Sequence, residues 1–155
     1  MTEPNTKPKK PSRAARNSAA RLLAVQALYQ YQKNKDTPRA LIREYLDHRS
    51  GMTLDEETYV PAEESHFITL VEGVAEHQDQ LQTILQAHRK GAKPVNEPLL
   101  LAIFLCGLYE LQMMGSIDTP IIVSDYVNVA KAFYEGGEPK MVNAVLDAAA
   151  KTLRP

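Results

Sequence analysis

The chain has 155 residues, of which 44% are apolar and 24% are charged, and it contains no Trp. This length and composition fit one compact domain with a single core, and they exclude a collagen-like, coiled-coil or fully disordered chain. Its single cysteine, Cys106, excludes an internal disulfide and a metal site built from several thiolates, which favours a reducing cytoplasm.

Charge is distributed unevenly, although the formal net charge is only -1. Residues 1–21 contain six basic side chains and one acidic side chain, which gives a net charge of +5. Residues 22–155 contain the other twelve basic and eighteen acidic side chains, which gives a net charge of -6. The first twelve residues lack the apolar stretch of a secretory signal, and the longest apolar run, Leu99–Tyr109, is far shorter than the ~20 residues of a membrane helix. The sequence therefore predicts a cytoplasmic protein with a basic start and an acidic body.

The first half of the chain predicts a tail and three helices. Residues 1–12 form a flexible basic tail, and residues 13–155 form the folded domain. Ser12 is an N-cap candidate for a helix over residues 13–33, and the Thr37-Pro38 pair begins a short second helix that ends before Gly51. After a polar loop over residues 50–62, apolar side chains keep one helical period from about residue 63 to 88, which predicts a single long amphipathic helix.

The second half predicts three further helices. Asn96 is the expected cap of the strongly apolar segment from Leu99 to Met113, which is hydrophobic almost all round and should lie centrally. A helix opens at residues 118–120 and breaks at the Gly136-Gly137 pair, and residues 138–139 begin the last helix. We predict an all-α fold, a compact bundle of about six or seven helices, without a convincing strand.

Four sequence strings carry a family resemblance. The string from Arg21 to Tyr29 reads Arg-Leu-Leu-Ala-Val-Gln-Ala-Leu-Tyr. It resembles the first-helix signature of the NusB family of bacterial transcription antitermination factors. Three further matches to that family follow in the expected order, namely Leu108–Leu111 before Asp118–Pro120, Val129–Phe133, and Val142–Asp147. Together the matches cover roughly residues 13–154.

The resemblance implies a NusB-like helical bundle without enzymatic activity or a cofactor. It implies binding of boxA-type RNA in ribosomal RNA transcripts together with NusE, a small-subunit ribosomal protein, so that RNA polymerase reads through terminators within an antitermination complex. A related domain precedes some ribosomal RNA cytosine methyltransferases, but the chain ends at Pro155, and we expect a standalone factor. Homodimerisation is left open, because family members differ in self-association.

Three departures from the family pattern leave alternatives open. Leu105 stands where the family usually has Arg, Ala144 stands where it usually has Gly, and the Arg cluster before Arg21 is sparse. One alternative is a diverged helical protein-protein adaptor without RNA binding. Another is a regulatory domain that acts with a separately encoded RNA-modifying enzyme.

Candidate binding residues follow from charge and from the resemblance. Basic side chains gathered where a tail meets a helix can neutralise RNA phosphates. The RNA-binding candidates are Lys9, Lys10, Arg13, Arg16, Arg21 and, from the resemblance, Lys140. The resemblance also gives the partner-binding candidates Gln26, Tyr29 and Glu97; Tyr29 falls on the apolar stripe of its helix, which favours packing or a protein contact over base stacking.

The remaining polar residues do not predict a catalytic or metal site. His66, His77 and His88 recur every eleven residues, about 16 Å per step along a helix, so one metal ion cannot bridge them and we expect surface or boundary histidines. Cys106 in the most apolar helix is an expected inert core residue. Asn143 and Asp147 share a helix face, from which we expect hydrogen bonds to a neighbouring helix.

Overall fold

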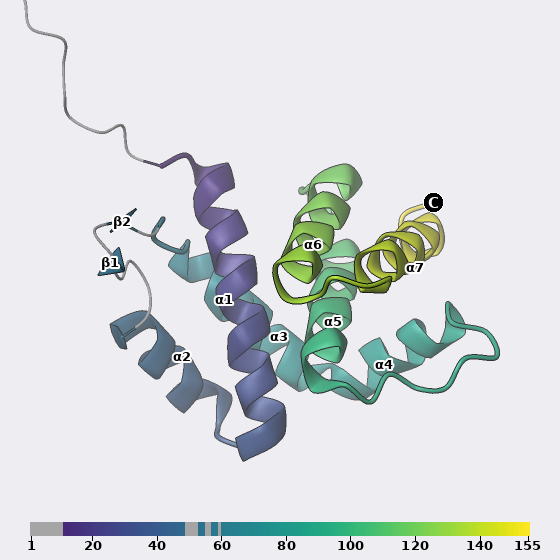
Figure 1. Ribbon diagram of the computed structural model, residues 1–155, viewed down its shortest axis with the longest axis horizontal. Helices are drawn as coiled ribbons and strands as arrows, with labels where there is room; N and C mark the ends of the chain where they lie inside the picture. Colours follow the sequence, from purple (N-terminus) through teal and green to yellow (C-terminus); the bar gives the residue numbers. More distant parts are fainter. Residues whose placement is uncertain (1–10, 49–52, 55–56, 59) are drawn as a thin grey trace, which may run out of the picture.

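The computed structural model describes residues 11–48, 53–54, 57–58 and 60–155 (Figure 1). Seven helices dominate this part of the chain, so the predicted all-α class is confirmed. The elements are α1 (Arg13–Asn34), α2 (Pro38–His48), β1 (Thr53–Leu54), β2 (Glu57–Thr58), α3 (Glu64–Glu76), α4 (Gln78–Ala87), α5 (Pro98–Met113), α6 (Thr119–Phe133) and α7 (Glu138–Leu153). The two short strands form an antiparallel pair within the segment predicted as a loop.

Two helix starts test the capping predictions. Ser12 Oγ accepts a hydrogen bond from Ala15 N at 3.1 Å, which confirms the predicted N-cap of α1. The predicted cap of α5 was wrong by one residue: Glu97, not Asn96, is the N-cap, and its carboxylate accepts hydrogen bonds from the first turn. Since Pro98 occupies the first helical position, the residue just before it takes the capping position.

The predicted long helix over residues 63–88 is divided in two at His77. The His77 backbone has φ -113° and ψ 23°, outside the helical region, and its N–H reaches the carbonyl oxygens of Gly73 and Val74. Its ring Nδ1 also lies 2.9 Å from the Gly73 carbonyl oxygen. The His77 side chain thus competes with backbone N–H groups for the Gly73 carbonyl oxygen at the end of α3. The spacing of apolar residues in the sequence does not reveal this competition.

Helix α5 is the centre of the core, as its composition predicted. Every residue from Ala102 to Leu111 is buried, and α5 packs against α1, α3, α4, α6 and α7. Figure 1 shows α1 and α2 on one side of α5 and α7 on the other, with α6 overlapping α5 in this view. None of the helices in the described ranges is long and apolar enough to cross a membrane.

The end of α7 is tied to the end of α5 by Arg154. Its guanidinium donates to the carbonyl oxygens of Leu111 at 2.7 Å, Ile117 at 2.6 Å and Met114 at 2.8 Å. The last carbonyl groups of a helix have no partner within the helix, and a cation there also interacts favourably with the helix dipole. Arg154 therefore fixes the α5–α6 connection against the C-terminal end of the chain.

Candidate nucleic-acid and partner interface

The basic start of α1 offers fewer free cations than its sequence predicts. Arg13 is exposed, whereas Arg16 donates from Nε to Glu63 Oε2 at 2.8 Å and from Nη1 to the Pro11 carbonyl oxygen at 2.6 Å. The hydrogen bond from Arg16 holds the pKa of the Glu63 carboxyl below its ordinary value. Lys9 and Lys10 lie outside the described residues. Arg13 is therefore the most available of the described RNA-binding candidates on α1.

Arg21 is buried in the core, with 1% of its surface exposed. Its Nε and Nη2 donate to the two carboxylate oxygens of Glu110 at 2.8 and 3.0 Å, and its Nη1 lies 2.5 Å from Asp125 Oδ2. Burial alone would lower the pKa of the guanidinium, but the hydrogen bonds and charge of Glu110 outweigh burial and raise it. This corrects the expectation that Arg21 is available to phosphate, because its donors already serve carboxylates.

Glu110 is the acceptor around which this core cluster forms. The Tyr126 hydroxyl donates to Glu110 Oε2, and His66 Nε2 lies 3.1 Å from Glu110 Oε1. Burial alone would raise the pKa of Glu110, but hydrogen bonds from His66 and Arg21 bring it below its ordinary value. His66 is 5% exposed, so the expectation of a surface or boundary histidine was wrong for this residue. The apolar run before Glu110 was the sequence signal that its carboxylate lies in the core.

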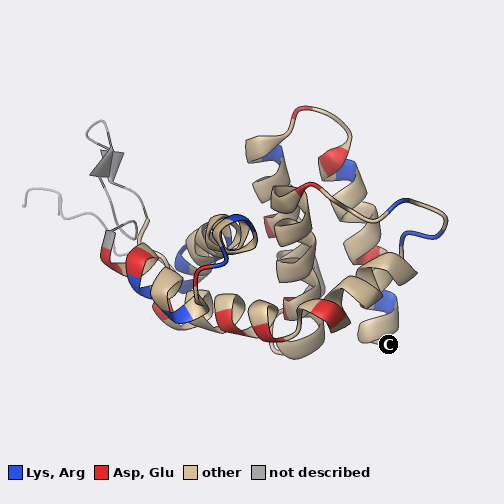
Figure 2. Cartoon of the chain, turned by 90° about the horizontal axis from the view of Figure 1, so that it is seen from below, with Lys and Arg blue, Asp and Glu red and all other residues tan. Residues whose placement is uncertain are grey.

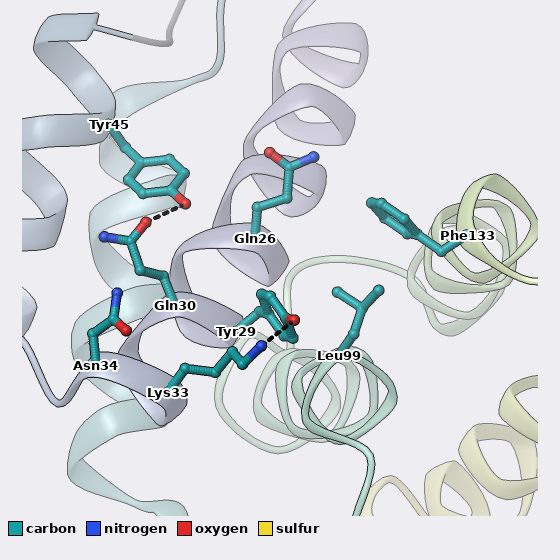
Figure 3. A pocket seen from close by; sticks show the side chains of 8 residues that line it. All are labelled: Gln26, Tyr29, Gln30, Lys33, Asn34, Tyr45, Leu99 and Phe133. Carbon is teal, nitrogen blue, oxygen red and sulfur yellow. Dashed lines mark hydrogen bonds between the residues drawn. The ribbon is translucent and has the colours of Figure 1, made fainter.

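A groove beside the second half of α1 contains two of the partner-binding candidates (Figure 3). Its volume is about 690 Å³. The groove is lined by residues of α1, α2, α5 and α6, namely Gln26, Tyr29, Gln30, Lys33, Asn34, Tyr45, Leu99 and Phe133, and we call it the tyrosine groove. Phe133 is 39% exposed at its edge, so the groove combines an open aromatic ring with amide groups and one cation.

Hydrogen bonds within α1 and from α2 hold the groove side chains in place. Lys33 Nζ lies 2.9 Å from the Tyr29 hydroxyl oxygen and 4.9 Å from the centre of its ring, and this hydrogen bond raises the pKa of Lys33. Tyr45 of α2 donates its hydroxyl to Gln30 Oε1 at 3.0 Å. Tyr29 is half-buried, as its position on the apolar stripe predicted, and its ring lines the groove.

Glu97, the third partner-binding candidate, links the N-terminus of α5 to the end of α6. Its carboxylate accepts hydrogen bonds from Leu99 N at 3.2 Å and from Leu100 N at 3.1 Å. It also accepts a hydrogen bond from the Tyr134 hydroxyl. Partial burial, together with the Glu97 hydrogen bond, raises the pKa of Tyr134. Glu97 does not itself line the groove, but its hydrogen bonds tie the start of α5, which contributes Leu99 to the groove, to the end of α6, which contributes Phe133.

The last helix presents its candidates to solvent. Lys140 is exposed in the first turn of α7. Asn143 Nδ2 donates to Asp147 Oδ2 at 3.3 Å and both residues are exposed, so the expected hydrogen bonds to a neighbouring helix were wrong. Of the positions that depart from the family pattern, Leu105 is buried in the core and Ala144 is exposed.

The described residues offer little for catalysis or metal binding. Cys106 is buried, and burial together with the charge of Glu110 raises the pKa of its thiol well above the ordinary value, as expected of an inert core residue. Within the described ranges there is no group of three or more His, Cys, Asp or Glu side chains that could hold a metal ion. The exposed cations and the tyrosine groove are therefore the features that need a functional explanation.

Comparison with known proteins identifies the family. The NusB family model matches residues 18–151. The transcription antitermination protein NusB of Bartonella henselae is 37% identical over 146 residues, which cover 93% of this chain and 92% of the relative. The protein of the same name from Sinorhizobium medicae is 38% identical over 138 residues, which cover 88% of this chain and 86% of the relative.

A solved structure supports the fold independently. T. maritima NusB is similar with a TM-score of 0.72 at 19% identity, covering 95% of this chain and 96% of that one. NusB proteins are transcription antitermination factors and not enzymes. The resemblance of the four sequence strings is thus confirmed along almost the whole chain, and the chain belongs to the NusB family.

Proposed function

We propose that this protein is a transcription antitermination factor that binds boxA-type RNA of ribosomal RNA transcripts together with the ribosomal protein NusE. The two proteins on one RNA promote read-through by RNA polymerase within the antitermination complex. Because such a factor acts on nascent bacterial transcripts, we expect the protein in the cytoplasm. The observation that carries this proposal is the identity of 37% over 146 residues with a transcription antitermination protein, covering 93% of this chain.

The available cations support RNA binding by charge. Arg13 at the start of α1 and Lys140 at the start of α7 are exposed, and Lys9 and Lys10 precede Arg13 in the sequence. Each phosphate neutralised by such a side chain releases counterions, so RNA affinity should fall as salt rises. We assign the phosphate contacts to Lys9, Lys10, Arg13 and Lys140, with a smaller contribution from the half-exposed Arg16.

The tyrosine groove supports the protein contact. Aromatic side chains are enriched in protein interfaces, and a half-buried Tyr29 beside an exposed Phe133 offers such a surface. We assign the NusE contact to Gln26, Tyr29 and Glu97. Two modest contacts that act on one RNA then give a higher joint affinity than either contact alone.

The test measures binding of a boxA-type RNA oligonucleotide by fluorescence anisotropy, with and without purified NusE, at two salt concentrations. The variant K9Q/K10Q/R13Q removes three positive charges and leaves the buried Arg21 in place. The control R39Q/R43Q/K151Q removes the same charge from exposed positions elsewhere. We expect NusE to tighten binding, salt to weaken it, and the first variant to lose roughly 100-fold in affinity at 0.1 M salt while the control loses much less.

The protein-protein adaptor is the second candidate, because Arg16 and Arg21 are both engaged by carboxylates within the protein. If the wild type and the first variant are equally inert toward RNA with NusE present, RNA binding is overturned. Retained NusE binding in that case establishes the adaptor. Read-through of a terminator in a reconstituted transcription assay then separates an active factor from a passive adaptor.

A further inference from the structure

The connection between α4 and α5 is a basic exception in an acidic body. Residues 80–96 contain Arg89, Lys90 and Lys93 and not a single Asp or Glu, whereas residues 22–155 as a whole carry a net charge of -6. Figure 2 shows this connection as a largely blue, basic loop on the side of the molecule away from α2. Acidic residues, drawn in red, lie along α3. The loop thus concentrates positive charge far along the chain from the basic start of α1.

The fold brings this loop against the first turns of α7, the helix that contains Lys140. Arg89 Nη1 lies 2.9 Å from the Sδ atom of Met141, the residue that follows Lys140 in the chain. Arg89 Nη2 donates a hydrogen bond to the carbonyl oxygen of Lys93 at 3.1 Å. Gly91 has φ +74°, a backbone conformation that favours glycine and lets the loop turn back at this point. We call the four side chains Arg89, Lys90, Lys93 and Lys140 the α4–α7 cluster.

Among the described residues, no carboxylate is paired with a cation of the α4–α7 cluster. Lys90, Lys93 and Lys140 are exposed, and across the described ranges none of the four cluster side chains forms an ion pair. Arg16 and Arg21 by contrast each bind a carboxylate. A phosphate can therefore bind the cluster without displacing a carboxylate, whereas binding at Arg16 or Arg21 would break an existing ion pair.

We infer that the α4–α7 cluster is a second phosphate-binding surface for RNA, which extends the RNA path from Lys140 onto the α4–α5 loop. The inference rests on the proposed function. A nucleic-acid backbone fits better than an acidic protein, because protein interfaces are enriched in aromatic residues and depleted in Lys, and this loop contains Lys without any aromatic side chain. Contacts of this kind position RNA and add affinity without reading its sequence.

The test uses the full chain and a boxA-type RNA extended by unrelated nucleotides on both sides. The variant K90Q/K93Q/K140Q removes three exposed charges and leaves Arg89 packed on Met141. We expect the slope of log affinity against log salt to fall by about 2, and affinity at 0.1 M salt to fall by roughly 100-fold, if all three side chains contact phosphate. The variant K90R/K93R/K140R should retain wild-type binding, and R39Q/R43Q/K151Q is the matched control for net charge.

The outcomes separate this inference from the proposed function. If the wild type binds RNA and K9Q/K10Q/R13Q weakens binding, but K90Q/K93Q/K140Q binds with the wild-type slope, the second surface and the Lys140 contact are both overturned, while RNA binding through the start of α1 stands. If the wild type binds no RNA, both fail. A Glu-rich peptide in the same assay tests the protein alternative: cluster-dependent binding of the peptide, without cluster-dependent binding of RNA, also overturns the inference. Unchanged thermal unfolding of each variant shows that its fold is intact.

Discussion

Glu110 is a carboxylate without solvent exposure that contacts polar side chains from three other elements. Arg21 of α1 binds it with two nitrogen atoms, Tyr126 of α6 donates its hydroxyl, and His66 of α3 lies beside it. Removing a charged group from water is costly, and only such close pairing compensates the loss of hydration. The cluster therefore specifies how α1, α3 and α6 are arranged around α5.

Breaking this pair from one side should destabilise the protein strongly. Arg21→Ala leaves Glu110 buried without its main cation, and we expect the free energy of unfolding to fall by about 3–5 kcal/mol. Urea denaturation at pH 7 measures the loss. The double variant R21M/E110L fills the site with apolar groups and should be more stable than either single variant. A loss below about 1 kcal/mol for Arg21→Ala would contradict a structural role for the pair.

The same cluster predicts how stability depends on pH. Because the folded protein holds the pKa of Glu110 below its ordinary value of 4.5, the unfolded chain takes up the Glu110 proton first as pH falls. The stability contributed by Glu110 is therefore fully present above pH 4.5 and is lost as pH falls through the lower folded-state value. Urea denaturation between pH 7 and pH 3 should show a smaller loss for Glu110→Gln than for the wild type. Equal losses would assign the acid sensitivity to other carboxyl groups.

At the scale of helices, two of the regularly spaced histidines end a helix. His77 ends α3 and His88 ends α4, and in each case the ring Nδ1 lies 2.9 Å from the carbonyl oxygen four residues earlier. The eleven-residue spacing thus corresponds to helix ends in two cases and to the core cluster in the third. Apolar periodicity predicted most helices because burial follows it, but it did not predict the break at His77, where a local hydrogen bond decides.

Helices α3 and α5 approach each other closely at Gly73. A Cβ atom at this position would overlap the ring of Tyr109, so Gly73→Ala forces the ring or a helix to move. We expect a loss of about 1–3 kcal/mol in the free energy of unfolding, measured by urea denaturation. The control Gly115→Ala adds a Cβ with nothing within 4 Å and should leave stability nearly unchanged. Equal effects of the two variants would contradict the close approach of α3 and α5.

At the scale of the whole molecule, the exposed cations assigned to RNA, namely Arg13, Lys90, Lys93 and Lys140, are not among the residues that line the tyrosine groove. The sequence predicted the excess charge near residue 1, because charge can be counted directly, and the family resemblance pointed to Lys140. It did not predict that Arg21 is buried, since only the folded chain brings Glu110 and Asp125 to the guanidinium. The sequence did not predict the groove either, because its lining residues come from four helices and meet only after folding.

Because the two sets of residues do not overlap, we expect separable losses of function. Tyr29→Ala removes an aromatic side chain from the tyrosine groove and leaves Arg13, Lys140 and the α4–α7 cluster unchanged. We expect affinity for NusE to fall by roughly 30-fold, as for other central interface tyrosines, while affinity for RNA alone stays at the wild-type value. Calorimetry with NusE and anisotropy with RNA measure the two effects. Tyr29→Phe retains the ring and should retain most NusE binding.

The control for this variant is Met113→Ala, which truncates another apolar side chain that is 54% exposed at the far end of α5. It should bind NusE like the wild type. If Tyr29→Ala also binds NusE normally, the partner contact lies outside the groove. If it loses RNA and NusE together while its thermal unfolding is unchanged, the two surfaces are energetically coupled. Only a selective loss of NusE supports a protein that holds RNA by charge on one surface and recruits its partner through an aromatic groove on another.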